Sequence, residues 1–163
     1  MEKISVMIIE DEVTTAYTLH AMLKGDNFSI IGVYDTAEYA LKKMEQLSKN
    51  QKEPDIVLVD IFLKGEMNGI ELAKIISKKF KSIIIFLTST TDKNIFEKAL
   101  NIRPFSYLIK PCDIRQISLT LKAALYNRKY QFELFEKIED LKKENLHLKN
   151  ELKKCHMQNN KES

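Results

Sequence analysis

The chain has 163 residues, of which 44% are hydrophobic and 30% are charged, and its formal net charge is +3. These values are typical of one globular domain with a sizeable core and an appendage, and the small charge favours neither nucleic acid nor a membrane as a partner. The two cysteines, Cys112 and Cys155, are far apart and lack metal-ligand spacing, which fits a reducing compartment. The apolar run at residues 4–9 is too short for a signal peptide or a membrane span, so we expect a cytoplasmic protein.

Short apolar segments alternate with segments of helical periodicity along the first 125 residues. The predicted strands are residues 4–9, 28–33, 56–59, 83–87 and 107–109. The predicted helices are residues 13–23, 37–47, 70–76, a segment through 96–100, and a last helix from about 113. Asp35 or Thr36, Asp92 and Asp113 are candidate N-caps. Five such units in sequence predict an α/β fold with a parallel, doubly wound sheet and right-handed crossovers.

Carboxylate, hydroxyl and amine side chains stand at the ends of the predicted strands. These residues are Glu10, Asp11, Asp60, Thr88 and Lys110. In a parallel sheet the carboxyl ends of the strands meet at one edge, where functional residues collect. The three carboxylates offer the hard oxygen ligands that Mg²⁺ prefers, and their mutual repulsion calls for a cation. With a lysine and a hydroxyl nearby, the set matches what phosphoryl transfer to a carboxylate needs.

The order Glu10-Asp11, Asp60, Thr88, Tyr107 and Lys110-Pro111 resembles the CheY-like receiver domains of bacterial response regulators in two-component signalling. The resemblance covers residues 3–125, and residues 60–69 are similar to the loop that follows the family's phosphorylated aspartate. It implies a flavodoxin-like, five-stranded sheet of order 2-1-3-4-5. No glycine-rich loop follows the first strand, so a dinucleotide site or a P-loop has little support.

The resemblance also implies a role for each of these residues. Asp60 would be the phosphoacceptor. Glu10, Asp11, Asp60 and the backbone carbonyl of Phe62 would hold Mg²⁺. A histidine kinase or phosphotransfer protein would donate the phosphoryl group.

Three further expectations concern the residues beside the acceptor. Thr88 and Lys110 would bind the phosphoryl oxygens, and Tyr107 would be an aromatic switch that turns inward behind Thr88. The Lys110–Pro111 bond would be cis. All three expectations rest on the resemblance.

The sequence departs from the usual family pattern at several positions. Glu10 replaces the commoner aspartate and is a longer ligand. Phe62 is bulky and is expected to hinder water, which predicts slow self-dephosphorylation. Phe105 follows an atypical Arg103-Pro104 pair, and we interpret it as an exposed apolar contact in place of the family's charged dimer face.

Two other classes of protein are alternatives to a response regulator. A haloacid-dehalogenase-like phosphatase needs a second aspartate two residues after its nucleophile, and Phe62 occupies that position here. A receiver fold that serves as a dimerisation scaffold without switching is the other alternative. The intact set of Glu10, Asp11, Asp60 and Lys110 favours a phosphoacceptor that is not an enzyme. A fragment of a longer regulator whose output domain is absent also stays open.

The last predicted helix has no stop signal, because neither glycine nor proline occurs between residues 113 and 158. We expect a receiver domain at residues 1–125, a helical coiled-coil extension at 126–157 and a disordered tail at 158–163, with no DNA-binding domain. Lysine and glutamate are nearly balanced in the extension, whereas a DNA-binding region needs a concentrated positive stripe.

A heptad pattern predicts a partner for this helix. Leu134, Leu141, Leu148 and Cys155 take the d positions, and Gln131, Ile138, Asn145 and Leu152 take the a positions. An isolated asparagine at an a position favours a parallel, two-stranded coil, so we expect a homodimer through residues 131–155. A solvated helix folded back on the receiver, or a linker to a further segment, are the alternatives.

Overall fold

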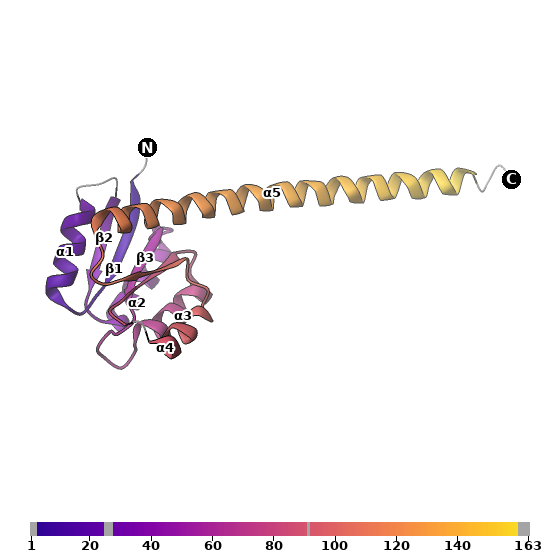
Figure 1. The fold of residues 1–163 in the computed structure, drawn as a ribbon. Helices are drawn as coiled ribbons and strands as arrows, with labels where there is room; N and C mark the ends of the chain where they lie inside the picture. The colour runs from indigo at the N-terminus through magenta and orange to yellow at the C-terminus, as the bar shows by residue number, and fades with distance from the viewer. Residues whose placement is uncertain (1–2, 25–27, 91, 160–163) are drawn as a thin grey trace. The chain divides into compact units, whose positions relative to one another are not determined.

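Strands and helices alternate strictly through the part of the chain that the structure describes (Figure 1). This computed structural model describes residues 3–24, 28–90 and 92–159, with side chains as far as residue 153. The strands are β1 (Ile4–Ile9), β2 (Phe28–Tyr34), β3 (Ile56–Asp60), β4 (Ile83–Thr88) and β5 (Ser106–Ile109). The helices are α1 (Val13–Lys24), α2 (Ala37–Lys49), α3 (Gly69–Lys79), α4 (Lys93–Leu100) and α5 (Ile114–Asn159).

The predicted strands agree with the observed ones to within one residue at each end. The helices are less well predicted, because α2 and α3 run two or three residues past their last apolar position. Asp92 and Asp113 accept hydrogen bonds from backbone N–H groups at the starts of α4 and α5, as predicted for N-caps. Thr36 is the N-cap of α2, but its side chain makes no capping hydrogen bond.

The sheet is entirely parallel, with strand order β2-β1-β3-β4-β5, which confirms the predicted order. β1 and β3 are direct neighbours although two helices and a strand separate them in the sequence. Their register pairs Ile9 with Val59, the last residue before Asp60. The carboxyl ends of these two strands therefore lie side by side.

Successive residues of the central strands face opposite sides of the sheet, and each side has its own apolar core. Met7, Val57 and Phe86 pack with α2, α3 and α4 on one side. Ile8, Leu58, Ile85 and Leu87 pack with α1 and the start of α5 on the other. Both faces of the sheet are covered, which explains why the central strands are continuously apolar.

α5 belongs to both compact units of the chain, which are residues 1–125 and residues 126–163. In the first unit, Ile117, Leu121 and Ala124 recur at helical spacing and are buried. In the second unit, none of the described side chains, which end at residue 153, is buried. The helix continues through Asn159, two residues past the predicted end of the extension at 157, so residues 158 and 159 are helical. Residues 160–163 of the predicted tail, and the side chain of Cys155, lie outside the described residues.

No helix in the described ranges is both long enough and apolar enough to cross a membrane. Phe105 is half-buried and packs on the core shared by α1 and α5. The expectation that Phe105 is an exposed contact is therefore wrong, because this side chain closes the edge of the core where β5 begins.

Candidate functional site

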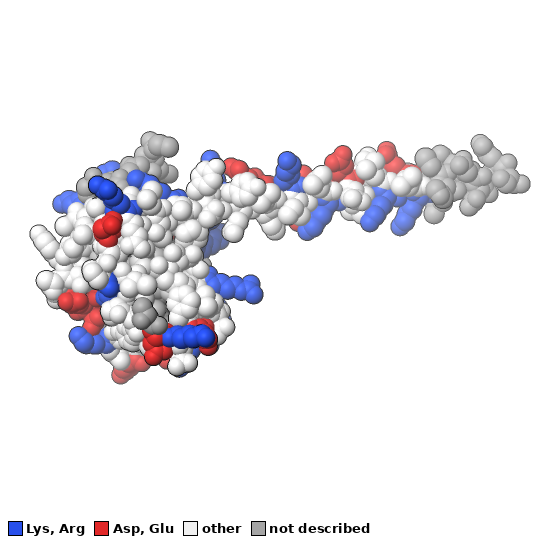
Figure 2. Space-filling model, in the orientation of Figure 1, with Lys and Arg blue, Asp and Glu red and all other residues white. Residues whose placement is uncertain are grey.

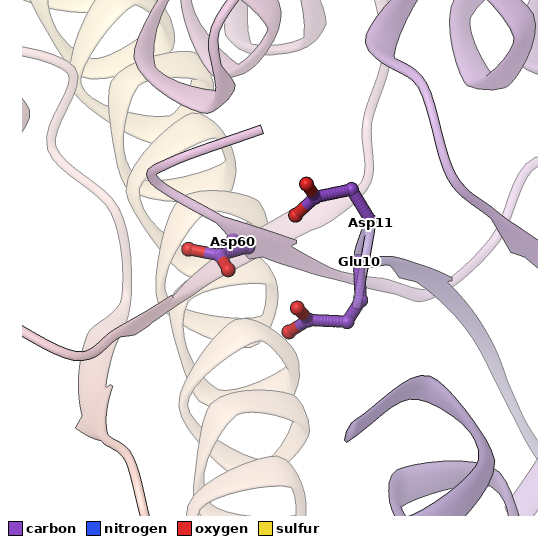
Figure 3. Close-up of side chains that lie close together, drawn as sticks. All are labelled: Glu10, Asp11 and Asp60. Atoms are coloured by element: carbon purple, nitrogen blue, oxygen red, sulfur yellow. The ribbon is translucent and has the colours of Figure 1, made fainter. Parts of the chain in front are cut away.

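Three carboxylates meet beyond the ends of β1 and β3 (Figure 3). Glu10, Asp11 and Asp60 each offer an oxygen within 4.8 Å of the others. Glu10 and Asp60 are buried, with 2% and 4% of their surfaces exposed. Burial and mutual repulsion both disfavour charge on such groups, so this cluster needs positive charge close by.

Lys110 supplies fixed positive charge to this cluster. Its Nζ lies 2.8 Å from Glu10 Oε2 and 2.7 Å from Asp60 Oδ2, and the side chain is only 17% exposed. The lysine is positioned by its backbone, whose N–H donates to the Thr88 carbonyl at 2.7 Å. The peptide bond between Lys110 and Pro111 is cis, as the resemblance implies.

The pKa values of the two buried partners respond to these surroundings. Burial raises the pKa of Glu10, and the negative charge of Asp60 raises it further, against the opposing effect of Lys110. Burial disfavours the charge on Lys110, but hydrogen bonds to Asp60 and Glu10 outweigh burial and raise the Lys110 pKa. The lysine is therefore held charged, whereas burial works against the charge on Glu10.

The loop after Asp60 folds back over its carboxylate. The Phe62 N–H donates to Asp60 Oδ1 at 2.9 Å, and the Phe62 side chain is 44% exposed. Gly69, at the start of α3, lies so close to the backbone of Asp60 that any Cβ there would overlap the Asp60 carbonyl oxygen. A glycine is required at this position because the helix start and the strand end touch. The role expected of the Phe62 carbonyl stays a prediction.

Thr88 is the last residue of β4, and Tyr107 is the second residue of the neighbouring strand β5, where it pairs with Phe86. Thr88 is buried, and its hydroxyl accepts a hydrogen bond from the Thr90 N–H at 3.1 Å. The Tyr107 ring lies against Phe86 and Phe96, with ring centroids 5.6 Å and 4.6 Å apart. The Tyr107 hydroxyl is buried and has no hydrogen-bond partner among the described residues, and burial raises its pKa.

Sequence reasoning missed one contact in the site. The Nζ of Lys64 lies 3.0 Å from Asp11 Oδ2. No sequence signal identifies this pair, because Lys64 lies in an irregular loop whose path depends on tertiary contacts. The side chains predicted at the strand ends do lie at the same edge of the sheet, and Tyr107 lies two residues before that edge on β5.

The donor set suits a magnesium ion. Three carboxylates close together provide hard oxygen ligands, and Asp11, the half-buried member of the three, leaves a side from which an ion and its waters can enter. The set lacks the imidazole and thiolate ligands that zinc or copper would favour.

The comparisons with known proteins agree with this geometry. The family model described as "Response regulator receiver domain" matches residues 6–122. The chain belongs to the family of response regulator receiver domains, the phosphoacceptor modules of two-component signalling.

Several relatives are of similar sequence. The sensory transduction protein LytT of Bacillus anthracis is 33% identical over 137 residues, covering 83% of this chain and 52% of the relative. The transcriptional regulatory protein CitB of Klebsiella pneumoniae is 32% identical over 124 residues, covering 75% and 50% respectively. The chain thus spans about half the length of these curated relatives.

Solved structures show the same fold. The signal receiver domain of a modulated diguanylate cyclase from Desulfovibrio desulfuricans G20 is 33% identical with a TM-score of 0.72, covering 78% of this chain and 97% of that one. A fusion that carries the yeast Spc42 trimeric coiled coil has a TM-score of 0.74 at 21% identity, covering 93% and 98%. At that identity the second likeness concerns the fold alone.

Proposed function

We propose that this protein is a phosphorylation-activated response regulator whose phosphoacceptor is Asp60, with a histidine kinase or phosphotransfer protein as the donor. The observation that carries the proposal is the Asp60 carboxylate itself. It is buried at a strand end, shares a metal-type cluster with Glu10 and Asp11, and is bonded to Lys110 at 2.7 Å. A histidine kinase draws its phosphoryl group from the cell's ATP, so we place the protein in the cytoplasm.

The chain's residues suit transfer from a phosphohistidine. An Asp60 carboxylate oxygen attacks phosphorus, so one P–O bond forms while the donor's N–P bond breaks and its electron pair returns to the imidazole. Mg²⁺ held by Glu10, Asp11, Asp60 and the Phe62 carbonyl would neutralise charge on the phosphoryl oxygens. Lys110 adds a fixed positive charge next to the attacked position.

The switch would begin at Thr88. Its hydroxyl now donates to the Thr90 carbonyl at 3.5 Å, and it has to give up that acceptor to donate to a phosphoryl oxygen. The space that it vacates would then let Tyr107 move inward behind it. The unpartnered Tyr107 hydroxyl supports this step, because a buried hydroxyl without a partner costs free energy that a new hydrogen bond recovers.

The tail would provide the output through protein contacts. The a and d positions of the extension carry large apolar side chains that solvent reaches, including Leu134, Ile138, Leu141, Leu148 and Leu152, which are 42–61% exposed. Such a row favours pairing with a second copy of the chain over residues 131–155.

One pair of like charges beside this row opposes pairing, because Lys142 would face Lys137 of the partner subunit in a parallel coil. Lys142 bonds to Glu139 of its own helix at 2.8 Å, which reduces this repulsion. In Figure 2 the extension carries lysine and acidic side chains together, without a continuous positive stripe on the visible face.

Phosphorylation can be tested with acetyl phosphate and Mg²⁺. We expect the intact chain to gain the mass of one phosphoryl group, and the Asp60→Asn variant to gain none. Equal labelling of the two proteins would contradict Asp60 as the acceptor. No labelling at any Mg²⁺ concentration would favour a scaffold that does not switch.

Oligomeric state is a separate test. Light scattering coupled to gel filtration should give a dimer for the full chain, and the Leu141→Asp/Leu148→Asp double variant should be monomeric. One structural neighbour carries a coiled coil that its name calls trimeric, so the mass has to distinguish two chains from three. A monomer at micromolar concentration would sink the pairing proposal and leave the Asp60 proposal intact.

A further inference from the structure

The feature that the proposed function leaves unexplained is the ion pair between Lys64 and Asp11. The Lys64 ammonium lies 3.0 Å from Oδ2 of Asp11, whose carboxylate is expected to bind the metal ion. The two side chains differ sharply in exposure, since 86% of Lys64 is exposed and only 13% of Asp11. The lysine therefore covers the metal-binding carboxylate from the solvent side.

The loop that carries Lys64 is fixed on both sides of it. Leu63 is buried in the core beneath α2 and α3. Gly65 has a φ of +135°, where any Cβ would be strained and would also approach the Glu38 carboxylate. The same carboxylate accepts a hydrogen bond from the Met67 N–H at 2.9 Å. The backbone at Lys64 is thus held in place near Asp11, while its side chain stays free to swing into water.

The other lysine of the site is a useful contrast. Lys110 is 17% exposed and bonds to two carboxylates at once, so its departure would leave buried charge without compensation. Lys64 bonds to one carboxylate at the rim, where an ion pair contributes little and is easily exchanged. Lys110 is a permanent part of the site, and Lys64 is a replaceable one.

We propose that Lys64 is a displaceable internal counter-ion of the metal site. It neutralises Asp11 while the site holds no divalent cation, and an incoming Mg²⁺ has to displace its ammonium from Asp11 Oδ2. Lys64 thereby raises the Mg²⁺ concentration at which the site fills. This inference rests on the proposed function, because it takes Asp11 as a magnesium ligand.

The test is a calorimetric titration of the full chain with Mg²⁺ at low ionic strength. We expect Lys64→Met to bind Mg²⁺ about 1.4-fold to fivefold more tightly than the native chain, the range typical of exposed charge contacts. Lys64→Arg keeps the positive charge and should bind no more tightly than the native chain. The difference in Mg²⁺ affinity between Lys64→Met and the native chain should become smaller as salt is added, because salt screens the solvent-exposed ion pair of Lys64 and Asp11.

Lys52→Met is the matched control. Lys52 is an exposed lysine between α2 and β3, at the opposite edge of the sheet, and its loss changes the net charge by the same amount. If Lys64→Met binds Mg²⁺ with the same affinity as Lys52→Met, or more weakly, the proposal is wrong.

The proposed function fails in a different way. If acetyl phosphate labels Asp60 in the native chain and the affinities of Lys64→Met and Lys52→Met are equal, only the role of Lys64 is lost. If no variant binds Mg²⁺ at millimolar concentration, the magnesium site itself is refuted, and the counter-ion role with it.

Discussion

Replacing Lys110 by methionine removes the only cation that bonds to both Glu10 and Asp60 among the described residues. Methionine keeps the length and apolar stem of the side chain, so the change is mainly one of charge. We expect Lys110→Met to be less stable than the native chain in EDTA at pH 8. The loss should shrink at pH 5, because burial raises the pKa of Glu10 and this carboxylate takes a proton more readily as pH falls.

The size of the effect follows from the distance between the carboxylates. Two unit charges at most 4.8 Å apart repel by about 3.5 kcal/mol or more at an effective dielectric constant of ~20. Breaking a buried ion pair by removing one partner commonly costs about 3–5 kcal/mol. Protonation of Glu10, whose pKa is already raised, limits the loss. We therefore expect about 3 kcal/mol at pH 8 and less than half of that at pH 5.

Urea unfolding followed by circular dichroism measures this difference, with Lys52→Met as the control for the loss of one positive charge. Added Mg²⁺ should stabilise Lys110→Met more than the native chain, because the ion restores compensation of the carboxylates. If Lys110→Met and Lys52→Met unfold at the same urea concentration in EDTA at pH 8, the charge balance inferred for this site is refuted.

Three smaller predictions concern single positions in the same site. Gly69→Ala places a Cβ on the Asp60 carbonyl oxygen and should lower the free energy of unfolding by about 3 kcal/mol, whereas Ser77→Ala on the same helix should change it little. In EDTA, the free energy of unfolding of the native chain should fall as pH rises from 4.5 to the raised pKa of Glu10, because the folded protein binds more protons than the unfolded one in that window. The Glu10→Gln variant should lack this fall. Phe62→Ala should shorten the lifetime of the phosphorylated protein about threefold, or about 0.7 kcal/mol in barrier, and an unchanged lifetime measured by intact mass would show that the ring does not shield the acceptor.

The strands were the easiest elements to predict, because their signal is local. Residues 56–59 and 83–87 are continuous apolar runs, and a sheet covered on both faces requires that pattern. The helix ends were harder, since the last turns of α2 and α3 consist of polar residues that carry no periodic signal. Thr36 shows the same limit, because its residue type fits an N-cap although its side chain makes no capping bond.

The candidate site also contains residues that the sequence could predict and one that it could not. Glu10, Asp60, Thr88 and Lys110 could be predicted because parallel topology brings the carboxyl ends of strands to one edge. Lys64 could not, because its loop position depends on the positive φ of Gly65 and on Glu38, which lies on α2. Long-range loop contacts of this kind leave no periodicity in the sequence.

The charges at this edge of the sheet explain why two lysines of different exposure are useful. In the resting chain the three carboxylates of the cluster face two lysines, so the negative charge is largely compensated without any metal. A phosphoryl group on Asp60 would add negative charge that Lys110 alone cannot balance, so a divalent cation becomes more favourable than a lysine at Asp11. Exchange at Asp11 is feasible because Lys64 is held only at the rim, whereas exchange at Lys110 would expose two buried carboxylates to each other. On the proposed function, the cation that is exchanged is therefore the one at the half-buried Asp11. Lys110 stays bonded to the buried carboxylates Glu10 and Asp60 throughout.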